Sequence, residues 1–342
     1  MLEKFVVENY MNFRGSLELD LTADPSYTYN TSAVKDRILS TSIILGRSGS
    51  GKSNLGKALF DIVETQKKTT PSEAPRAEEE DQEPKDISSF SYHFRDNQRT
   101  YKFIYKKNRR NDILEESLFV DQEALFDYKD HGLSALAYMT NNPIQAGYSP
   151  VQYISNFIQR ILHITPDRCS GPAVEGIDPE TWIVQEHQED NLSSFLKQIS
   201  GQSLNLAAVR DPLTRKENLC IVVEKKALPF KKTASKGTLA LTNIFIALNI
   251  LPDPSLLFLD NIDADLDQET TEELFRCLST LKETQLIWST HKTSLVSNSL
   301  PRPDCYFLLQ EGQVKRLPEL TTRELREGHN LEKMLCQGEF GF

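Results

Sequence analysis

The sequence predicts an α/β protein, and three local patterns support that fold class. Residues 42–45 form a short apolar run typical of a buried strand, and residues 54–63 follow it with the apolar spacing of a helix. Two later apolar runs, at 256–260 and 285–291, also have the length of buried strands. The first ends in a carboxylate and the second in Thr-His, so polar groups are expected at the ends of both strands.

The segment between the first strand and the first helix matches the phosphate-binding loop pattern G-x-x-x-x-G-K-[ST]. Its glycines let the backbone turn tightly and bring N–H groups up to phosphates. Lys52 supplies a charge for the β- and γ-phosphates, and Ser53 supplies a hydroxyl ligand for Mg²⁺. The following helix adds an N-terminus that attracts anions. Nucleotide contacts are therefore expected from Gly46, Ser48, Gly49, Ser50, Gly51, Lys52, Ser53 and Asn54.

Composition limits the classes of protein to consider. The 342 residues can hold one large domain or two ordinary ones, and 39% hydrophobic with 26% charged residues is typical of a globular chain. The five cysteines are scattered without a C-x-x-C pair, which indicates reduced thiols rather than a zinc site. No apolar run reaches a membrane span of roughly 18–20 residues, and no secretory signal is visible, so a cytoplasmic protein without membrane contact is expected.

The net charge of −10 disfavours a general nucleic-acid coat but leaves a local basic patch open. The basic cluster at 106–110 is one such patch, with a solvated turn as the alternative interpretation.

The first part of the chain divides into strands and polar segments. Alternation over residues 1–23 predicts two strands joined by a turn near Arg14-Gly15, followed by a loop over 24–40. Residues 66–87 carry three prolines and an acidic run, so they predict a mobile insertion rather than part of a core. A solvated loop is preferred there over a docking tail.

The middle of the chain has strand and helix patterns but no recognisable motif. It looks inserted between the two halves of one nucleotide-binding domain. Strand patterns occupy residues 90–94, 100–105, 114–120, 204–209 and 219–223, and helical spacing occupies 133–165 and 180–200.

A second set of polar groups lies in the last third of the chain. Asp260 ends its strand where phosphate-loop NTPases place a carboxylate that contacts the Mg²⁺ shell, although a simple capping Asp is the alternative. Upstream, a strongly apolar helix over 239–251 is closed by prolines at 252 and 254. A second anion-binding element is expected at its start, formed by Ser235, Lys236, Gly237 and Thr238.

The order of these motifs resembles that of the ABC-class ATPases, in particular the SMC-like, RecF-like and OLD-like subgroup. The order is a phosphate loop, a Ser-x-Gly at a helix start, a strand that ends in Asp and a strand that ends in His. The resemblance implies an ABC-type P-loop NTPase with a mixed sheet and an inserted β-plus-helical region. It also implies ATP and Mg²⁺ as cofactors, with Ser53 and Asp260 at the metal. In that class the signature helix serves the neighbouring subunit's nucleotide, so self-association through ATP-sandwiched subunits is expected.

Further segments fit the same resemblance. Arg14, in Asn12-Phe13-Arg14, resembles the basic residue that lies near the phosphates in SMC-like repair ATPases. Residues 264–267 resemble the D-loop, and 290–295 resemble the switch-histidine segment. The tail at 322–333 looks like that of small OLD/AbiL-like bacterial ATPases. The expected division is 1–65 and 231–342 for the two ATPase halves, 66–87 for the acidic insertion and 88–230 for the inserted strands and helices.

The chain departs from the class at one catalytic position. The class has Asp-Glu at the end of the second strand, whereas this chain has Asp260-Asn261. An Asn side chain cannot accept a proton, so Mg²⁺-ATP binding is expected to be intact and hydrolysis slow. The candidate catalytic residues are Asp260, Asn261 and His291.

Other polar residues carry weaker signals. Gln98 and Gln122 are the nearest candidates for the missing Q-loop glutamine, and both are expected to be exposed. Four histidines lack metal-ligand spacing and are expected to be structural or exposed: His93, His131, His163 and His187.

Three functions remain open at this stage. The resemblance favours an ATP-binding regulator of bacterial antiviral defence, related to Septu-like or retron-linked ATPases, whose separate effector is an HNH nuclease. A RecF-like DNA-repair ATPase acting directly on nucleic acid is the alternative. A transporter subunit is the weakest of the three hypotheses, because it requires a clear Q-loop and the Asp-Glu pair, and the sequence shows neither.

Overall fold

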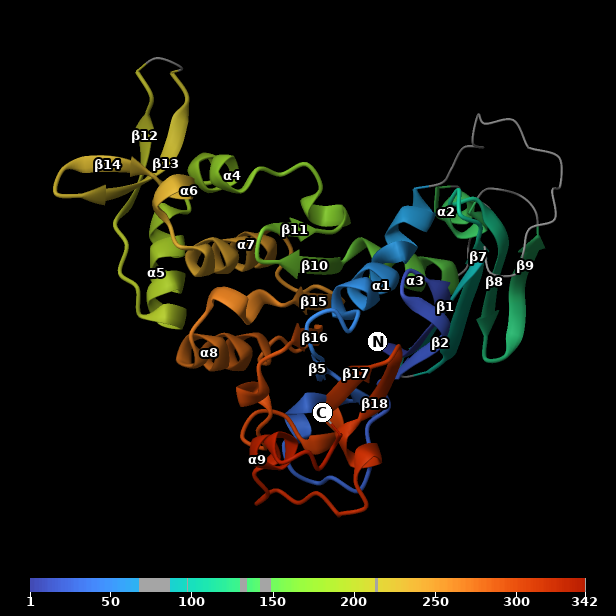
Figure 1. The fold of residues 1–342 in the computed structure, drawn as a ribbon. Helices are drawn as coiled ribbons and strands as arrows, with labels where there is room; N and C mark the ends of the chain where they lie inside the picture. Colours follow the sequence, from blue (N-terminus) through green and yellow to red (C-terminus); the bar gives the residue numbers. More distant parts are fainter. Residues whose placement is uncertain (68–86, 97, 130–133, 142–148, 213–214, 342) are drawn as a thin grey trace.

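The structure is a computed structural model that describes residues 1–67, 87–96, 98–129, 134–141, 149–212 and 215–341 (Figure 1). A 7-stranded sheet lies at its centre, in the order β11-β10-β15-β16-β5-β17-β18. Neighbours from β10 to β17 are parallel, and β11 and β18 pair antiparallel at the edges, so the sheet is mixed. The predicted α/β class is confirmed. The strands are β5 (Thr41–Leu45), β10 (Ile161–Thr165), β11 (Arg168–Ser170), β15 (Leu256–Asp260), β16 (Gln285–Thr290), β17 (Tyr306–Gln310) and β18 (Gln313–Arg316).

The central strands are apolar throughout because both faces of the sheet are covered. Every residue of β5, β15 and β16 is buried. Along β5 the side chains alternate: Ile44 packs with α1 (Lys52–Gln66), whereas Ile43 and Leu45 pack in the cluster that holds α7 (Lys236–Ile250) and α8 (Gln268–Leu278). One short strand therefore contributes to both cores.

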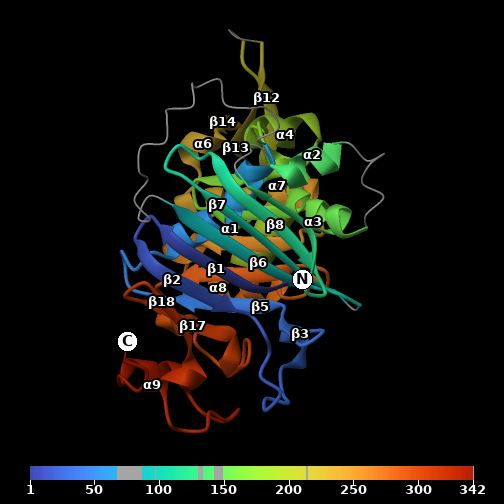
Figure 2. The same cartoon turned by 90° about the vertical axis from the view of Figure 1, so that its right-hand side faces the viewer.

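A second, 6-stranded antiparallel sheet covers the other side of α1, in the order β2-β1-β6-β7-β8-β9 (Figure 2). Tyr92 donates to the Ala58 carbonyl at 2.9 Å, and Tyr105 donates to Asp61 Oδ2 at 2.9 Å, so both tyrosines tie the sheet to the helix. Helix α1 is thus held between two sheets. The strands are β1 (Leu2–Tyr10), β2 (Phe13–Asp20), β6 (Ser88–Arg95), β7 (Thr100–Lys107), β8 (Ile113–Val120) and β9 (Glu123–Lys129).

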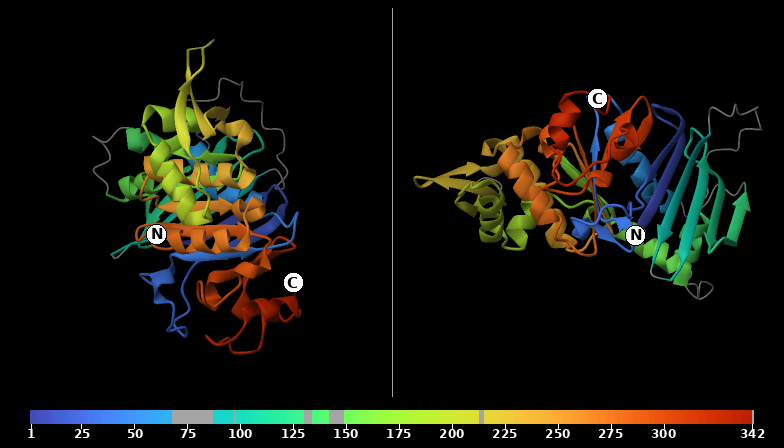
Figure 3. Two further views of the ribbon diagram at one scale, coloured as in Figure 1. Left: turned by 90° about the vertical axis from the view of Figure 1, so that its left-hand side faces the viewer. Right: turned by 90° about the horizontal axis from the view of Figure 1, so that it is seen from below.

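The remaining elements extend this framework. The 3-stranded sheet β12-β13-β14 projects from the body beside α4, α5 and α7 (Figures 1 and 3). No helix of the described residues is long and apolar enough to cross a bilayer. The other elements are β3 (Val34–Lys35), β4 (Ile38–Leu39), β12 (Leu206–Arg210), β13 (Glu217–Val223), β14 (Lys226–Pro229), α2 (Ala135–Asn141), α3 (Ser149–Gln159), α4 (Pro179–Gln185), α5 (Glu189–Ser200), α6 (Phe230–Thr233) and α9 (Leu331–Cys336).

Two sequence-based element predictions were wrong. The first turn lies at Met11-Asn12 instead of Arg14-Gly15, because Arg14 already belongs to β2. The helical pattern over 133–165 ends at Gln159, and residues 161–165 form strand β10. The sequence analysis also missed seven strands, namely β3, β4, β9, β11, β14, β17 and β18.

The predicted domain division stays a prediction. Within its inserted region, β10 pairs in parallel with β15, so that part of the chain belongs to the central sheet. Most of the acidic insertion at 66–87 lies outside the described residues.

The basic cluster at 106–110 is partly paired within the fold. Lys107 is buried and its Nζ lies 2.6 Å from Asp61 Oδ2, while Lys106 pairs with Glu115 at 2.7 Å. Two of its cations are therefore neutralised within the fold.

Candidate nucleotide site

The phosphate loop, Asp260 and His291 lie together because three parallel strands end at the same edge of the central sheet. Asp260 is opposite Ser289 in the β15–β16 register, and Thr290 is opposite Leu45 in the β16–β5 register. The phosphate loop, Asp260 and His291 therefore follow neighbouring strand ends, where open α/β sheets bind ligands.

The phosphate loop turns on left-handed glycines. Gly51 caps the start of α1 with φ 107°, and Gly49 has φ 80°. A Cβ on Gly51 would lie 2.6 Å from Asn12 Nδ2 and 3.1 Å from the Phe13 ring, so the loop packs closely against the turn before β2, and the positive φ of Gly51 favours glycine there. Asn54 Nδ2 donates to Asn12 Oδ1 at 2.6 Å. The Asn12-Phe13-Arg14 segment therefore lies against the loop, and Arg14 itself is exposed.

Lys52 is held inside the loop. It is 8% exposed, and its Nζ donates to the Gly46 carbonyl at 2.6 Å and the Arg47 carbonyl at 3.1 Å. Burial lowers the pKa of Lys52, while Asp260 and Asp263 act in the opposite direction. A phosphate in the loop would compete with these two carbonyl oxygens for the ammonium.

Asp260 is prepared to act as an anionic oxygen ligand. It is 5% exposed, and Ser289 Oγ donates to its Oδ1 at 2.7 Å. Burial alone would raise the pKa of Asp260. This effect is outweighed by the nearby His163 ring and by the Ser289 and Ser53 hydroxyls, so the pKa of Asp260 lies below its usual value. The carboxylate is therefore ionised at neutral pH.

The oxygen donors at this edge fit Mg²⁺. Mg²⁺ is commonly held by one or two protein oxygens together with substrate phosphates rather than by a complete protein cage. The hydroxyl of Ser53 and the carboxylate of Asp260 supply such a set. Among the residues that the structure describes, no group of three or more His, Cys, Asp or Glu side chains forms an alternative metal site.

Asn261, where a catalytic Glu was expected from the resemblance, contacts His291, the predicted switch histidine. Asn261 Oδ1 lies 2.7 Å from His291 Nδ1. Asn261 has φ 54°, a left-handed conformation that Asn tolerates better than most residues. The contact joins two residues that follow neighbouring strands, and it orients the His291 ring.

Asp263 is not available as a replacement base. It is fully buried, and its two oxygens accept from Trp288 Nε1 at 3.1 Å and from Thr290 Oγ1 at 2.6 Å. Its role is to hold β16 to the segment after β15. Asp265 is exposed nearby, and its carbonyl oxygen lies against Gly237.

The predicted signature element is built as a helix start. Ser235 caps α7 by accepting from the Thr238 backbone N–H at 3.1 Å, and Thr238 Oγ1 donates to Gln202 at 2.9 Å. Ser235 and Lys236 are exposed. Within the described part of the chain, no hydrogen bond joins residues 235–238 to the phosphate loop of the same chain.

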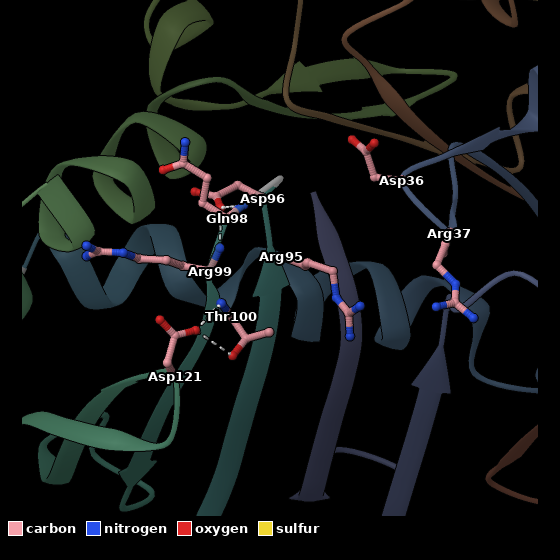
Figure 4. Close-up of a pocket in the computed structure, with 8 residues that line it drawn as sticks. All are labelled: Asp36, Arg37, Arg95, Asp96, Gln98, Arg99, Thr100 and Asp121. Atoms are coloured by element: carbon pink, nitrogen blue, oxygen red, sulfur yellow. Dashed lines mark hydrogen bonds between the residues drawn. The ribbon is translucent and has the colours of Figure 1, made fainter.

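The two candidate Q-loop glutamines lie elsewhere. Gln98 lines a polar cavity of about 420 Å³ that includes no phosphate-loop residue (Figure 4). The carboxylates there are used in turns: Asp96 accepts from the Gln98 backbone N–H at 2.8 Å, and Asp121 accepts from Thr100 (Figure 4). Gln122 is exposed in the β8–β9 turn.

One histidine that was expected to be structural or exposed lies buried beside Asp260. His163, on β10, places Nε2 3.7 Å from Asp260 Oδ2. The signal that would have identified it is the apolar run around it, which forms a strand beside β15. His93 and His187 lie outside the site, and His131 lies outside the described residues.

Comparison with solved structures relates this fold to ATPase heads. A structure described as the SmcHead bound to the C-winged helix domain of ScpA shares 15% identity, with a TM-score of 0.51 over 92% of this chain and 96% of that one. An Smc head domain with an extended coiled coil, bound to the C-terminal domain of ScpA derived from Pyrococcus furiosus, gives 13% identity and a TM-score of 0.50 over 92% and 95%. At these identities the likeness shows the fold alone, which is the ABC-type ATPase fold.

A structure of the recombination mediator protein RecF with ATPrS aligns at 13% identity over 93% of this chain and 98% of that one, with a TM-score of 0.45. No protein-family model matches the chain. No curated protein matches it at a significant level.

Proposed function

We propose that this chain is an ATP-binding regulatory subunit that assembles through ATP held between two copies and hydrolyses it slowly. The observation that carries the proposal is the pairing of Asn261 with His291 beside the phosphate loop, its Lys52 and the candidate Mg²⁺ ligands Ser53 and Asp260. The ABC-type fold implies nucleotide binding. The identity of the nucleotide as ATP is part of the proposal.

The assembly follows from the two half-sites. Lys52 and Asp260 lie at one edge of the central sheet, while Ser235 and Lys236 are exposed at the start of α7 without bonds to that edge. A second copy in head-to-tail arrangement brings its Ser235 element to the γ-phosphate held by the first. ATP then stabilises the assembled state by binding it more tightly than the separate subunits.

Slow turnover follows from Asn261. A carboxylate at this position would accept a proton from the attacking water, whereas an amide only hydrogen-bonds it. Mg²⁺, when bound, neutralises charge on the phosphate oxygens. Asp260 and Ser53 would hold the cation, Lys52 would neutralise phosphate charge, and Asn261 and His291 would be the side chains available to hydrogen-bond a water.

The biological setting is proposed from the resemblance to small OLD/AbiL-like and Septu-like ATPases. In that setting the chain controls a separate effector in antiviral defence, an HNH nuclease by analogy. Direct action on DNA is less well supported, because the net charge is −10 and two cations of the predicted basic cluster are paired internally.

The test is the molar mass of the purified chain with ATP, with ADP and without nucleotide. Ser235→Asp is the informative variant, because Asp caps a helix as well as Ser while placing a negative charge against the γ-phosphate. Gly237→Asp is less suitable, since a Cβ there would lie 2.6 Å from the Asp265 carbonyl oxygen and would disturb the fold itself.

The wild type is expected to double its mass with ATP, and Ser235→Asp to remain a monomer. Asn330→Asp is the matched control, because Asn330 caps α9 in the same way and lies outside the site. A Ser235→Asp variant that dimerises with ATP like the wild type would exclude this interface. Capture from the native host, followed by identification of co-purifying chains, tests the effector.

A further inference from the structure

His163 approaches the nucleotide site from a strand that sequence reasoning placed in a helix. β10 runs parallel to β15, with His163 opposite Phe258 in the register. This register brings Nε2 to 3.7 Å from Asp260 Oδ2. His163 is 7% exposed, so its ring lies inside the protein.

The ring is enclosed by apolar groups. Phe60 of α1 lies 5.0 Å from it between ring centroids, and Phe258 meets it edge-on at 5.3 Å. Gly56 of α1 completes the enclosure. A Cβ there would lie 2.7 Å from Phe258 Cε1 and 3.2 Å from His163 Nε2, so the helix approaches this closely only with glycine. The ring therefore has little freedom to turn away from Asp260.

The nitrogen that faces Asp260 has no hydrogen-bond partner among the described residues. A buried polar nitrogen without a partner is unfavourable, and natural structures rarely keep one without a reason. A separation of 3.7 Å is too long for a hydrogen bond. A small rotation of the Asp260 side chain would close the gap, and the neutral imidazole suffices because it carries one N–H.

We propose that His163 is a positioning residue for the cation ligand Asp260. Its Nε2–H donates to Asp260 Oδ2 when a divalent cation is held with the nucleotide, while the Ser289 hydroxyl holds Oδ1. The carboxylate is then fixed in one orientation toward the cation. Residues that orient a metal ligand in this way commonly change metal affinity about 10–100-fold when they are replaced. The inference rests on the proposed nucleotide site.

The test compares two replacements of nearly equal shape in the full chain. His163→Gln keeps an N–H donor, and His163→Met removes it while filling the same apolar space. A fluorescent ATP analogue is held at fixed concentration and MgCl₂ is titrated, with an EDTA sample as the cation-free baseline. His93→Met is the control, because His93 is half-buried on a strand of the other sheet and bonds to Ser91.

His163→Gln is expected to need the same Mg²⁺ concentration for half-saturation as the wild type and as His93→Met. His163→Met is expected to raise the Mg²⁺ concentration at half-saturation by at least about tenfold. Its binding of the analogue without a cation should stay within twofold of the wild type. Should the Met variant not fold, His163→Leu provides the same comparison.

Two results would overturn the inference: equal Mg²⁺ dependence of wild type and Met variant, or an equal shift in the Gln and Met variants. The second would show that the ring acts by packing and not by donating a hydrogen bond. A wild type that binds no analogue at any Mg²⁺ concentration would instead contradict the proposed function, so the two failures are distinguishable.

Discussion

Asn261→Glu should accelerate ATP hydrolysis. The side chain follows β15 and already contacts His291, so a carboxylate here would lie among the catalytic candidates. A positioned general base contributes about 10²–10⁴-fold, equivalent to roughly 3–5 kcal/mol of activation free energy. Because the present geometry is set for Asn, we expect the lower end, about 10²-fold.

The same change costs some stability. Asn261 has φ 54°, and a longer residue in this left-handed conformation loses about 1–2 kcal/mol. Loss of the bond to His291 removes about 1 kcal/mol more. Asn261→Gln carries the same two penalties without a proton acceptor, so it is the matched control for Asn261→Glu.

The assay is phosphate release at saturating Mg²⁺-ATP, with thermal unfolding of each variant to confirm that it is folded. The wild type and Asn261→Gln should turn over far below the roughly 10 s⁻¹ of a median enzyme, and Asn261→Glu should be faster than both. Equal rates for the Glu and Gln variants would refute the reasoning about the missing carboxylate. Brisk wild-type hydrolysis would do the same and make His291 the first base to examine.

Three further predictions concern binding and stability. Lys52→Ala should weaken ATP binding by at least about tenfold, because the charge opposite the β/γ-phosphates is lost; calorimetric titration measures it, and unchanged affinity would remove the phosphate-loop assignment. Asp263→Ala should lower the free energy of unfolding by about 2–4 kcal/mol, because it leaves Trp288 Nε1 and Thr290 Oγ1 buried without an acceptor; urea unfolding measures it, and a loss below about 1 kcal/mol would contradict that role. Burial raises the pKa of Glu116 to about 7, so the folded state holds a proton that the unfolded state releases, and stability should fall as the pH rises from about 4.5 to about 7. Glu116→Gln should flatten this trend in denaturant midpoints across that pH range, and an equally steep trend in the variant would show that other groups cause it.

Local patterns in the sequence predicted three strands of the central sheet, β5, β15 and β16, and the helices α1 and α7. The apolar run of β5, the glycines before Lys52 and the spacing of α1 each depend on neighbours within a few residues. The Ser235 helix start is equally local, because its capping bond reaches only to Thr238. The structure has these features as predicted because tertiary contacts favour the same conformation as the local sequence does.

Features that depend on distant partners were not predictable. The apolar residues from Ile154 to Leu162 have helical spacing, yet the helix ends at Gln159 and Ile161 begins a strand, because pairing with β15 overrides local periodicity. Lys107 looked like part of an exposed basic cluster. Its burial depends on Asp61, which lies on α1 and is distant in sequence.

The candidate site also combines features that the local sequence predicts with features that depend on distant partners. Asp260 was a candidate because it ends an apolar run, and Asn261 and His291 were candidates because their segments resemble those of ABC-class ATPases. The contact between Asn261 and His291 required the β15–β16 pairing, and the position of His163 required a strand that was not predicted. The sequence therefore supplied the candidate site residues, while the structure showed which side chains contact them.

The central claim is that one ATP joins Lys52 of one copy to Ser235 of another, and mixing two variants tests it most directly. In a head-to-tail dimer of Lys52→Ala with Ser235→Asp, one composite site carries both defects and the other carries neither. Each variant alone should stay monomeric with ATP by light scattering, and an equimolar mixture should form dimers that retain about one ATP per pair. A mixture that stays monomeric while the wild type dimerises, or a wild type that stays monomeric with ATP, would contradict the account.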